Sequence, residues 1–484
     1  MTYKLRAQQL GDAPAIPIPI PPGKGAESID LRNQRLVSLD AFRGFIMIML
    51  AASGFGIARF ASLPEDAPVW KQCDYEWWQW LHFHFEHPAW KSIFDTMRVS
   101  FWDLIQPAFM FMVGVAMPFS YAKREREGQK GFGRFIHAFV RAVVLTLLGV
   151  FLYSLNAERT NWIFTNVLAQ IGLGYFFVYL LLGRQFGTHL ISLAAILLAY
   201  FFFFYSNVPP DDFDFAAVNA KAERGEVYDE KYAAWSKNAN AASDFDIWLL
   251  NELRTPAVAA TNETDDPAGA DDADATPKVD EPAGAEPGKG SLIRRWLFAA
   301  SEPFQFNSGG YTTLNFVPSI GTMLLGLMCG QLLISRRGKW ANLLILLAAG
   351  AICVVDGVLM HQYMCPIVKR IWTPSWTMFS GGWVIWMLAA FYFVFDILPL
   401  KKLAFPLVVV GMNSIVMYMM GQLIRPWVTD NIVKTHFTGV LESIFGTGAL
   451  ADDMFGRLID PTAAFVVFWL IAFWMYRKRL FVRI

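Results

Sequence analysis

The chain has 484 residues, of which 55% are hydrophobic and only 17% are charged, and its formal net charge is zero. A soluble chain of this size usually carries about a quarter charged residues, and a nucleic-acid-binding chain usually has a basic surplus. Four cysteines are too few for a disulfide scaffold or a zinc module with paired spacing. We therefore expect an all-α, polytopic membrane protein whose partner is the lipid bilayer and not a nucleic acid.

Apolar runs of about 17–25 residues, long enough to cross a bilayer as helices, predict ten membrane spans. They cover residues 39–60, 101–121, 137–155, 165–183, 187–205, 313–334, 341–359, 376–397, 403–424 and 461–477. Helices 1–5 thus fall within residues 37–205 and helices 6–10 within residues 313–484. The polar, Pro-rich residues 1–36 lack a signal-peptide core and are expected to form a disordered tail.

The distribution of Lys and Arg predicts the orientation. These residues collect between spans 2 and 3, 6 and 7, and 8 and 9, and at both ends of the chain. With ten spans, all of these clusters fall on one side, which the positive-inside rule makes cytoplasmic. Both termini are then cytoplasmic, in a multi-pass protein that we expect in the inner membrane of a bacterium.

The opposite face receives an aromatic loop, residues 61–100, and a long extracytoplasmic insertion, residues 206–312. Residues 255–290 of the insertion are acidic and rich in Ala, Pro and Gly, which predicts disorder. Cys73 and Cys365 also fall on this face, where a disulfide can persist. The sequence leaves open whether they pair.

Polar residues in or beside the spans are informative, because each costs free energy in lipid unless it is buried in protein or paired. Asp40 and Arg43 begin the first span, where Ser38 or Asp40 can cap the helix and Arg43 can meet an anion from the cytoplasm. Asn413 lies within span 9. It can serve either as a contact between helices or as a hydrogen-bond donor to an oxyanion.

The aromatic loop carries three histidines, His82, His84 and His87. His82 and His84 could place two metal ligands on one side of a strand, but no third ligand of convincing spacing follows, so no metal is expected. The other interpretation is a single catalytic imidazole. Asp103, at the outer end of span 2, could fix the tautomer of that imidazole or simply favour the start of its own helix.

Five motifs occur in an order that resembles a known family. They are Arg-Leu-Val-Ser-Leu-Asp-Ala-Phe-Arg-Gly from residue 35, His-Pro-Ala-Trp from residue 87, Asp-Leu-Ile-Gln-Pro-Ala-Phe-Met-Phe-Met-Val-Gly from residue 103, Trp-Thr-Pro-Ser from residue 372 and Gly-Met-Asn-Ser-Ile-Val-Met-Tyr from residue 411. Together they resemble the heparan-α-glucosaminide N-acetyltransferase catalytic domain and its bacterial relatives. The resemblance covers most of residues 35–478, apart from residues 206–312.

The resemblance implies a transmembrane acetyltransferase. Such an enzyme takes acetyl-CoA, its co-substrate, from the cytoplasm and acetylates an amino sugar or other glycan on the far side. By match to its motif, His87 would be the acyl acceptor or general base. The resemblance implies further roles for Asp103 and Asn413 in catalysis, for Arg43, Asp40, Ser414 and Tyr418 in binding acetyl-CoA, and for Trp90, Trp372, Ser375 and Lys369 in binding the acceptor.

Two other functions stay open at this stage. The number of spans and the polar residues within them also suit a transporter or flippase for a sugar or lipid-linked substrate. Departures from the family pattern at Ala169-Gln170 and Val368 suit a non-catalytic descendant that still binds an acyl donor. The sequence is also compatible with a homodimer, and it identifies neither the acceptor nor the choice between an acyl-enzyme and direct transfer.

Overall fold

The structure is a computed structural model that describes residues 36–155, 157, 160–253, 303–335 and 337–482. These residues form helices and loops without any named strand, and residues Phe94 and Arg98 form an isolated antiparallel bridge. The predicted all-α class is confirmed. The predicted tail up to residue 35 and the acidic residues 255–290 lie outside the described residues.

Seven of the described helices are long and apolar enough to cross a membrane. They are α4 (Phe101–Arg126), α5 (Gly131–Tyr153), α7 (Phe186–Tyr205), α10 (Phe316–Ile334) preceded by η5 (Thr313–Asn315), α11 (Lys339–Tyr363), α12 (Pro374–Tyr392) continued by the π-helix η6 (Phe393–Ile397), and α17 (Gly456–Arg477). A shorter apolar helix, α6 (Val167–Leu181), occupies the predicted span 165–183.

Two predicted spans are broken helices. The first consists of α1 (Val37–Ala51), η1 (Ser53–Gly56) and α2 (Ile57–Ala61), and it bends by 49°. All four η1 residues have a positive φ, which cannot continue a right-handed helix. The second consists of η7 (Lys401–Ala404) with α13 (Phe405–Met412), followed by α14 (Ser414–Leu423), with a bend of 66°. If each pair is one span, up to nine described helices can cross the membrane; the count of ten and the side of the termini stay predictions.

The shorter elements lie mainly in the loops and the insertion. They are α3 (Tyr75–Phe85), α8 (Ala241–Leu253), α15 (Arg425–Val428), α16 (Thr438–Phe445), the 3-10 helices η2 (Pro68–Lys71), η3 (Ala222–Arg224), η4 (Glu230–Trp235) and η7 (Lys401–Ala404), and the π-helix η8 (Thr429–Phe437).

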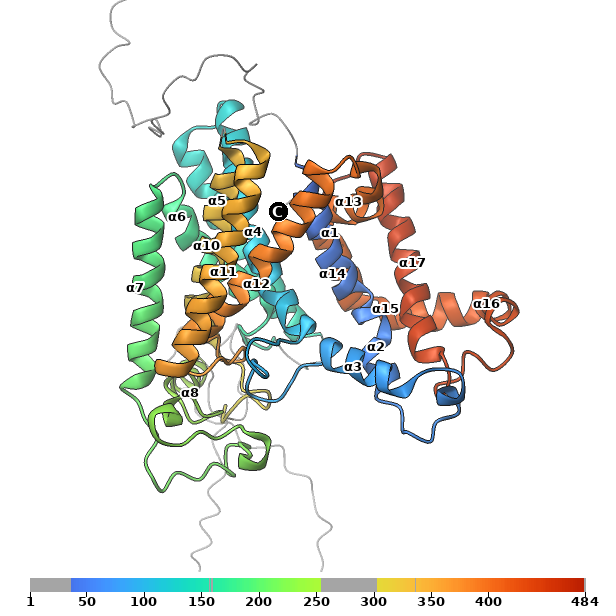
Figure 1. Ribbon diagram of the computed structural model, residues 1–484, viewed down its shortest axis with the longest axis horizontal. Coiled ribbons are helices and arrows are strands. Elements are labelled where there is room, and N and C mark those ends of the chain that lie inside the picture. The colour runs from blue at the N-terminus through green and yellow to red at the C-terminus, as the bar shows by residue number, and fades with distance from the viewer. Residues whose placement is uncertain (1–35, 156, 158–159, 254–302, 336, 483–484) are drawn as a thin grey trace, which may run out of the picture.

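The helices form two groups that stand side by side (Figure 1). The larger group contains α4–α7 and α10–α12, and the smaller contains α1, α13, α14 and α17. The groups meet where α1 packs against α4 and α12. In Figure 1, α3 and α8 lie at the lower end of the molecule, whereas α13 and the C-terminal end lie at the upper end.

Within the smaller group, α1 and α13 approach each other through glycines. A Cβ atom on Gly44 would lie 1.8 Å from the carbonyl oxygen of Leu407, and one on Gly411 would lie 2.0 Å from that of Asp40. Small residues allow helix backbones to come this close in a membrane, where packing and not hydrophobicity holds helices together. The glycines in two of the five motifs are therefore explained by this contact.

The start of α1 is capped from a distant part of the chain. The Asp396 carboxylate, in η6, accepts hydrogen bonds from the backbone N–H groups of Val37, at 3.2 Å, and Ser38, at 3.1 Å. These N–H groups have no partner within the helix, and the positive end of the helix dipole favours a carboxylate there. The predicted cap by Ser38 or Asp40 is wrong, because neither side chain accepts these bonds.

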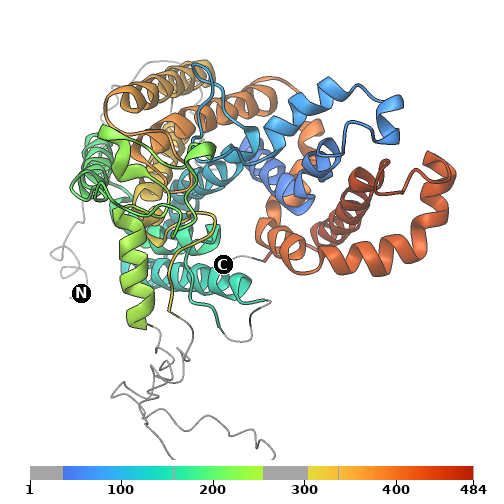
Figure 2. The ribbon, with the colours of Figure 1, turned by 90° about the horizontal axis from the view of Figure 1, so that it is seen from below.

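The described parts of the insertion pack onto the outer loops at the lower end of the larger group (Figure 2). Trp90 and Trp235 are both fully buried, and Trp90 Nε1 donates to the carbonyl oxygen of Trp235 at 2.9 Å. Gly310, with φ 74°, lies against the Trp90 ring, where a Cβ atom would approach the ring to 2.5 Å. The insertion is thus fixed to the loop that carries His87.

The structure answers whether Cys73 and Cys365 pair: they do not. Cys73 and Cys365 are both free thiols. Cys365 is buried beside Val368 and Ile371, whereas Cys73 packs in a separate apolar cluster around Phe60. Each thiol is therefore part of a different packed region.

Candidate active site

His87 is positioned by the end of α3. The helix begins with the Asp74 side chain, which accepts a hydrogen bond from Trp77 N at 3.0 Å. It ends at Phe85, and Glu86 already has an extended backbone. Proline disfavours the helical conformation of the residue before it, and His87 directly precedes Pro88. The proline therefore keeps His87 out of the helix and in the following loop.

The helical conformation of α3 overturns the metal-site arrangement considered for His82 and His84. Both residues lie on α3, and residues two apart on a helix do not share a face. His82 Nε2 instead lies 3.1 Å from Glu86 Oε2. In the part of the chain that the structure describes, no group of three or more His, Cys, Asp or Glu side chains is placed to hold a metal.

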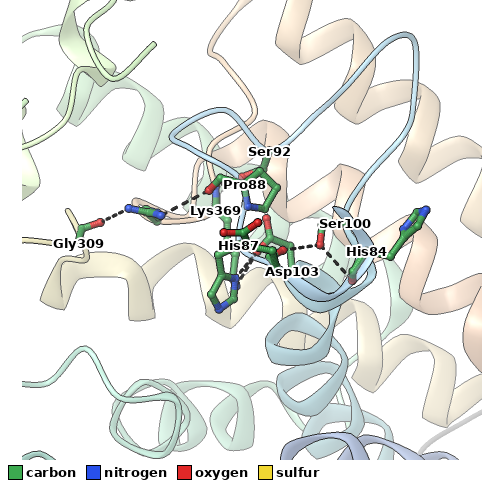
Figure 3. Close-up of polar contacts among 10 residues, drawn as sticks. His84, His87, Pro88, Ser92, Ser100, Asp103, Gly309 and Lys369 are labelled. Carbon is green, nitrogen blue, oxygen red and sulfur yellow. Dashed lines mark hydrogen bonds and ion pairs between the residues drawn. The ribbon is translucent and has the colours of Figure 1, made fainter. Parts of the chain in front are cut away.

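The imidazole of His87 meets the carboxylate of Asp103 (Figure 3). The distance from His87 Nδ1 to Asp103 Oδ1 is 2.7 Å, and Asp103 lies in the first turn of α4 with only 3% of its surface exposed. Ser100, just before α4, donates from its hydroxyl to the carbonyl oxygen of Glu86 at 2.7 Å. The two predicted residues are thus brought together by the ends of neighbouring helices.

Lys369 completes this cluster from the loop between α11 and α12 (Figure 3). Its Nζ lies 3.0 Å from Asp103 Oδ1 and 3.2 Å from His87 Nδ1, and 3% of the residue is exposed. The sequence resemblance assigned Lys369 to acceptor binding, whereas in the structure its ammonium contacts the Asp103 carboxylate. A buried carboxylate needs a positive partner, and that need is the one sequence signal that could have suggested a lysine here.

Backbone contacts hold Lys369 in place. Its N–H donates to Ser92 Oγ at 3.0 Å, and Ser92 N donates to the carbonyl oxygen of Ile367 at 2.9 Å. Ser375, in the first turn of α12, donates from Oγ to the carbonyl oxygen of Pro366 in this loop at 2.8 Å. The loops that carry His87 and Lys369 are therefore bonded directly to each other.

Three residues predicted to bind the acceptor lie away from the pocket beside His87, and their role in binding stays a prediction. Trp90, Trp372 and Ser375 are all buried. Trp372 has a φ of 47° and donates from Nε1 to Thr322 Oγ1 at 3.3 Å. None of the three lines the pocket beside His87. Their side chains support the loops around the site, and contact with an acceptor is not favoured by their positions.

The contact with Asp103 favours one tautomer of His87. A separation of 2.7 Å between Nδ1 and a carboxylate oxygen requires a proton between them. The proton belongs on Nδ1, which donates to ionised Asp103, so Nε2 carries the free lone pair. Burial and the Lys369 ammonium lower the pKa of His87 from its ordinary value, although the hydrogen bond to Asp103 opposes this. The ring is therefore neutral near neutral pH.

A pocket of about 450 Å³ opens beside His87. Its lining comes from three parts of the chain: His87, Pro88 and Ala89 of the aromatic loop; Asn219, Lys221, Arg224, Glu226, Lys237 and Ser308 of the insertion; and Arg370 of the loop between α11 and α12. Sequence reasoning singled out only His87 and the adjoining Pro88 and Ala89 of its motif. It missed the other lining residues, because the insertion and the loop after α11 meet the aromatic loop only in three dimensions. A pocket formed by converging polar groups beside a reactive side chain is the expected form of a binding site.

The pocket is positively charged. Its one acidic lining residue, Glu226, is paired at 2.9 Å with Lys237, and both side chains are almost fully buried. Lys221 and Arg224 are exposed. Arg370 donates to two backbone carbonyl oxygens, of Gly309 at 3.1 Å and Pro88 at 3.4 Å, which leave its charge uncompensated. The surface next to His87 therefore favours anionic groups.

Asn413 does not join His87. It is fully buried at the break between α13 and α14. Its Nδ2 donates to the carbonyl oxygen of Leu480 at 3.0 Å, and its Oδ1 accepts from Val482 N at 3.0 Å. The side chain thus connects the helix break to the C-terminal segment, and the predicted role beside the histidine has no support in this geometry.

The residues predicted to bind acetyl-CoA are spread along the smaller helix group. Arg43 lies 4.0 Å from Asp40 near the start of α1. Ser414 begins α14 and is partly buried, and the buried Tyr418 ring lies 6.2 Å from the Phe109 ring. The structure does not gather these four side chains into one cluster with His87.

The region that contains His87 is similar to a known protein family. A family model described as heparan-alpha-glucosaminide N-acetyltransferase, catalytic, matches residues 77–228. No curated protein matches the chain. The matched range extends into the insertion, which the motif resemblance left out, and it ends before Lys369 and Arg370. Residues 77–228, which carry both His87 and Asp103, are thus similar to the catalytic region of the heparan-alpha-glucosaminide N-acetyltransferase family.

Proposed function

We propose that this multi-pass membrane protein transfers the acetyl group of acetyl-CoA, taken from the cytoplasmic side, to an amino sugar or glycan bound beside His87 on the outer side. One observation carries the proposal: the 2.7 Å contact between His87 Nδ1 and Asp103 Oδ1, beside a pocket and within the matched region. We place the protein in the cytoplasmic membrane of a bacterium.

The donor approaches from the basic end of the helices. The phosphates of CoA cannot enter lipid, because even one charge at the bilayer centre costs roughly 2.5–3.5 kcal/mol or more. Arg124, near the C-terminal end of α4, and Arg43 of α1 are cations suited to these phosphates. Asp103 lies at the opposite end of α4, about 30 Å away at 1.5 Å per residue. The thioester arm must therefore extend between the helices to reach His87.

Two routes of acetyl transfer fit the tautomer of His87. In direct transfer, the acceptor amine attacks the thioester carbonyl, a C–N bond forms, the C–S bond breaks, and Nε2 takes the amine proton and returns one to the thiolate. In the acyl-enzyme route, Nε2 attacks the thioester carbonyl and forms a C–N bond, and the C–S bond breaks to release the CoA thiolate. The amine then attacks the acyl group, the bond to Nε2 breaks, and the amine proton passes to the thiolate or to water. In both routes Asp103 accepts the hydrogen bond from Nδ1–H, which orients the ring so that Nε2 points away from the carboxylate.

The positive charge of the pocket narrows the class of acceptor that we propose. Lys221, Arg224 and Arg370 favour a glycan that carries acidic groups near its amine. The same positive charges disfavour an ammonium ion and so favour the neutral amine, which is the nucleophile. The same cationic side chains thus attract the acidic groups of the glycan and keep its reacting amine neutral.

The test uses the full-length protein in lipid nanodiscs with acetyl-labelled acetyl-CoA and glucosamine as the acceptor. Labelled N-acetylglucosamine is expected from the parent, and none above background from His87→Ala. The matched control is His436→Ala, because His436 is an exposed histidine in η8; it should retain full activity. Incubation without acceptor, followed by peptide mass analysis, separates the routes, since only the acyl-enzyme route leaves an acetylated His87.

Acetyl transfer that survives in His87→Ala would remove the proposal. A transporter or flippase predicts instead that labelled sugar crosses the membrane of sealed liposomes in the absence of acetyl-CoA. Sugar movement without acetylation would replace the enzyme by that function.

A further inference from the structure

Lys369 lies behind the reactive histidine and not in the pocket in front of it. Its ammonium contacts Asp103 Oδ1 at 3.0 Å and His87 Nδ1 at 3.2 Å. Only 3% of its side chain is exposed, and it is absent from the pocket lining. A group in this position cannot meet the acceptor, so any influence on the reaction must pass through its two neighbours.

The charge of Asp103 explains what Lys369 can do. A carboxylate buried to this degree is stable as an ion only beside a positive charge. Without a lysine, the nearest group able to supply that charge is His87 itself, which would then become an imidazolium. An imidazolium has no lone pair and can act neither as base nor as nucleophile. A separate permanent cation removes this conflict.

The contacts of Lys369 also limit its movement. Its backbone N–H is bonded to Ser92 Oγ, and the Ser92 backbone is bonded to Ile367. Ser92 belongs to the same outer loop as His87. The ammonium, the carboxylate and the imidazole are therefore tied to two loops that are bonded to each other.

Other charges face His87 and must be included. The charged groups around the ring are Asp103 of α4, Lys369 and Arg370 of the loop between α11 and α12, and Lys221, Arg224, Glu226 and Lys237 of the insertion. Glu226 is neutralised by Lys237. Of these groups, Lys369 is the cation that also contacts Asp103.

We propose that Lys369 is a positioning residue for the acetyl transfer: its ammonium compensates Asp103, so that His87 stays neutral with Nδ1–H bound to the carboxylate and Nε2 presented to the pocket. The inference rests on the proposed role of His87, but its principal test needs no turnover. Burial and Lys369 lower the pKa of His87 in agreement with this arrangement.

The test is the pH dependence of His87 modification by diethyl pyrocarbonate, which reacts with neutral imidazole. The His87 side chain is 42% exposed, so the reagent can reach it. Peptide mass analysis follows His87 and, as an internal reference, the exposed His436 in the same sample. In the parent, the midpoint for His87 is expected below the ordinary pKa of histidine, 6.5. A midpoint above 6.5, which Asp103 alone would impose, would overturn the inference without any variant.

Variants then test Lys369 itself. In Lys369→Gln, labelling of His87 near pH 6, relative to that near pH 8, is expected to fall roughly three- to tenfold, because the cation that opposes the imidazolium is gone. Lys369→Arg should retain most of the parent profile. Lys91→Gln is the matched control, because Lys91 is an exposed lysine in the His87 loop. An unchanged profile in Lys369→Gln would show that the lysine serves only the fold.

Activity measurements separate this inference from the proposed function. If the parent acetylates the sugar, the acidic side of the pH–rate profile should move to higher pH in Lys369→Gln and not in Lys91→Gln. A purely structural lysine would instead lower the rate equally at every pH. If no acetyl transfer occurs but the labelling profile moves, the proposed function fails while the role of Lys369 stands.

Discussion

His87 Nδ1 and Asp103 Oδ1 are 2.7 Å apart, although the first residue lies in a loop after α3 and the second in the first turn of α4. The contact fixes which nitrogen of the ring is free. Asp103 is almost fully buried, and His87 lies at the wall of a pocket. The Nδ1 edge of the ring therefore faces a buried carboxylate, and ligands in the pocket can reach the ring from its other side.

Replacing Asp103 by Asn should test this contact. The amide keeps the size of the side chain but removes the charge that holds the Nδ1 proton, so acetyl transfer should fall about a hundredfold or more. The rate of sugar acetylation measures the effect. Asp95→Asn is the control, because Asp95 is an exposed residue paired with Arg98 on the surface. Equal rates for both variants would argue against a catalytic contact.

The acidic limit of activity should lie below the ordinary pKa of histidine, 6.5. Burial and Lys369 lower the pKa of His87, so the ring stays neutral to a lower pH than a free histidine. Activity should be full above the lowered pKa and should decline as the pH falls through it. A pH–rate profile in nanodiscs measures this limit, and a decline that begins above pH 6.5 would contradict the prediction.

Charge reversal in the pocket should change the preference among acceptors. Lys221→Glu is expected to raise the KM for an acidic amino glycan roughly fivefold and to leave the KM for glucosamine nearly unchanged. The physical reason is repulsion between the new carboxylate and the acidic groups of the acceptor. Lys71→Glu, at an exposed position in η2, controls for net charge. Equal changes in KM for both acceptors would show that the pocket does not discriminate acceptors by their charge.

Asp246 should make the stability of the protein depend on pH. This buried carboxyl of α8 accepts from Thr313 N at 2.9 Å through Oδ2, and its Oδ1 has no partner among the described residues. Burial raises the pKa of Asp246 to about 6. The folded state then holds the proton more tightly than the unfolded state. The resulting stabilisation is complete below pH 3.8 and disappears as the pH rises through about 6.

Asp246→Asn removes the ionisation but keeps an oxygen that can accept from Thr313. The variant is expected to unfold at a higher temperature than the parent at pH 8, by the equivalent of at most about 3 kcal/mol. Thermal unfolding in detergent between pH 5 and pH 8 measures the difference. A gap between variant and parent that is constant across this range would exclude the titration of Asp246 as its cause.

The contact between α1 and α13 should not tolerate a side chain. Gly44→Val would place its Cβ within 1.8 Å of the Leu407 carbonyl oxygen, so the two helices would have to separate. We expect a strong loss of monodisperse protein in fluorescence-detected size-exclusion chromatography. Gly187→Val is the control, because no atom lies within 4 Å of a Cβ built at Gly187. Similar loss in both variants would point to helix propensity and not to the contact.

The apolar runs of the sequence determined where the long helices lie, because a helix in lipid must satisfy its backbone within itself and cover about 30 Å with apolar side chains. The same reasoning pointed to Asp103 and to one imidazole of the aromatic loop, since ionisable groups at the ends of spans need partners, and the family resemblance chose His87. The sequence could not predict the bends at η1 and Asn413. A run of apolar residues records hydrophobicity, whereas a bend depends on the neighbours that accept it.

Tertiary structure alone decided the rest of the site. Lys369 and Asp103 are separated by most of the chain, yet they form one ion pair at 3.0 Å. Lys221 and Arg224 gained their place beside His87 from the folding of the insertion, and Asp396 capped α1 from η6. A charge in the sequence states that a partner is required, but only the packing of distant loops and helices chooses which partner it receives.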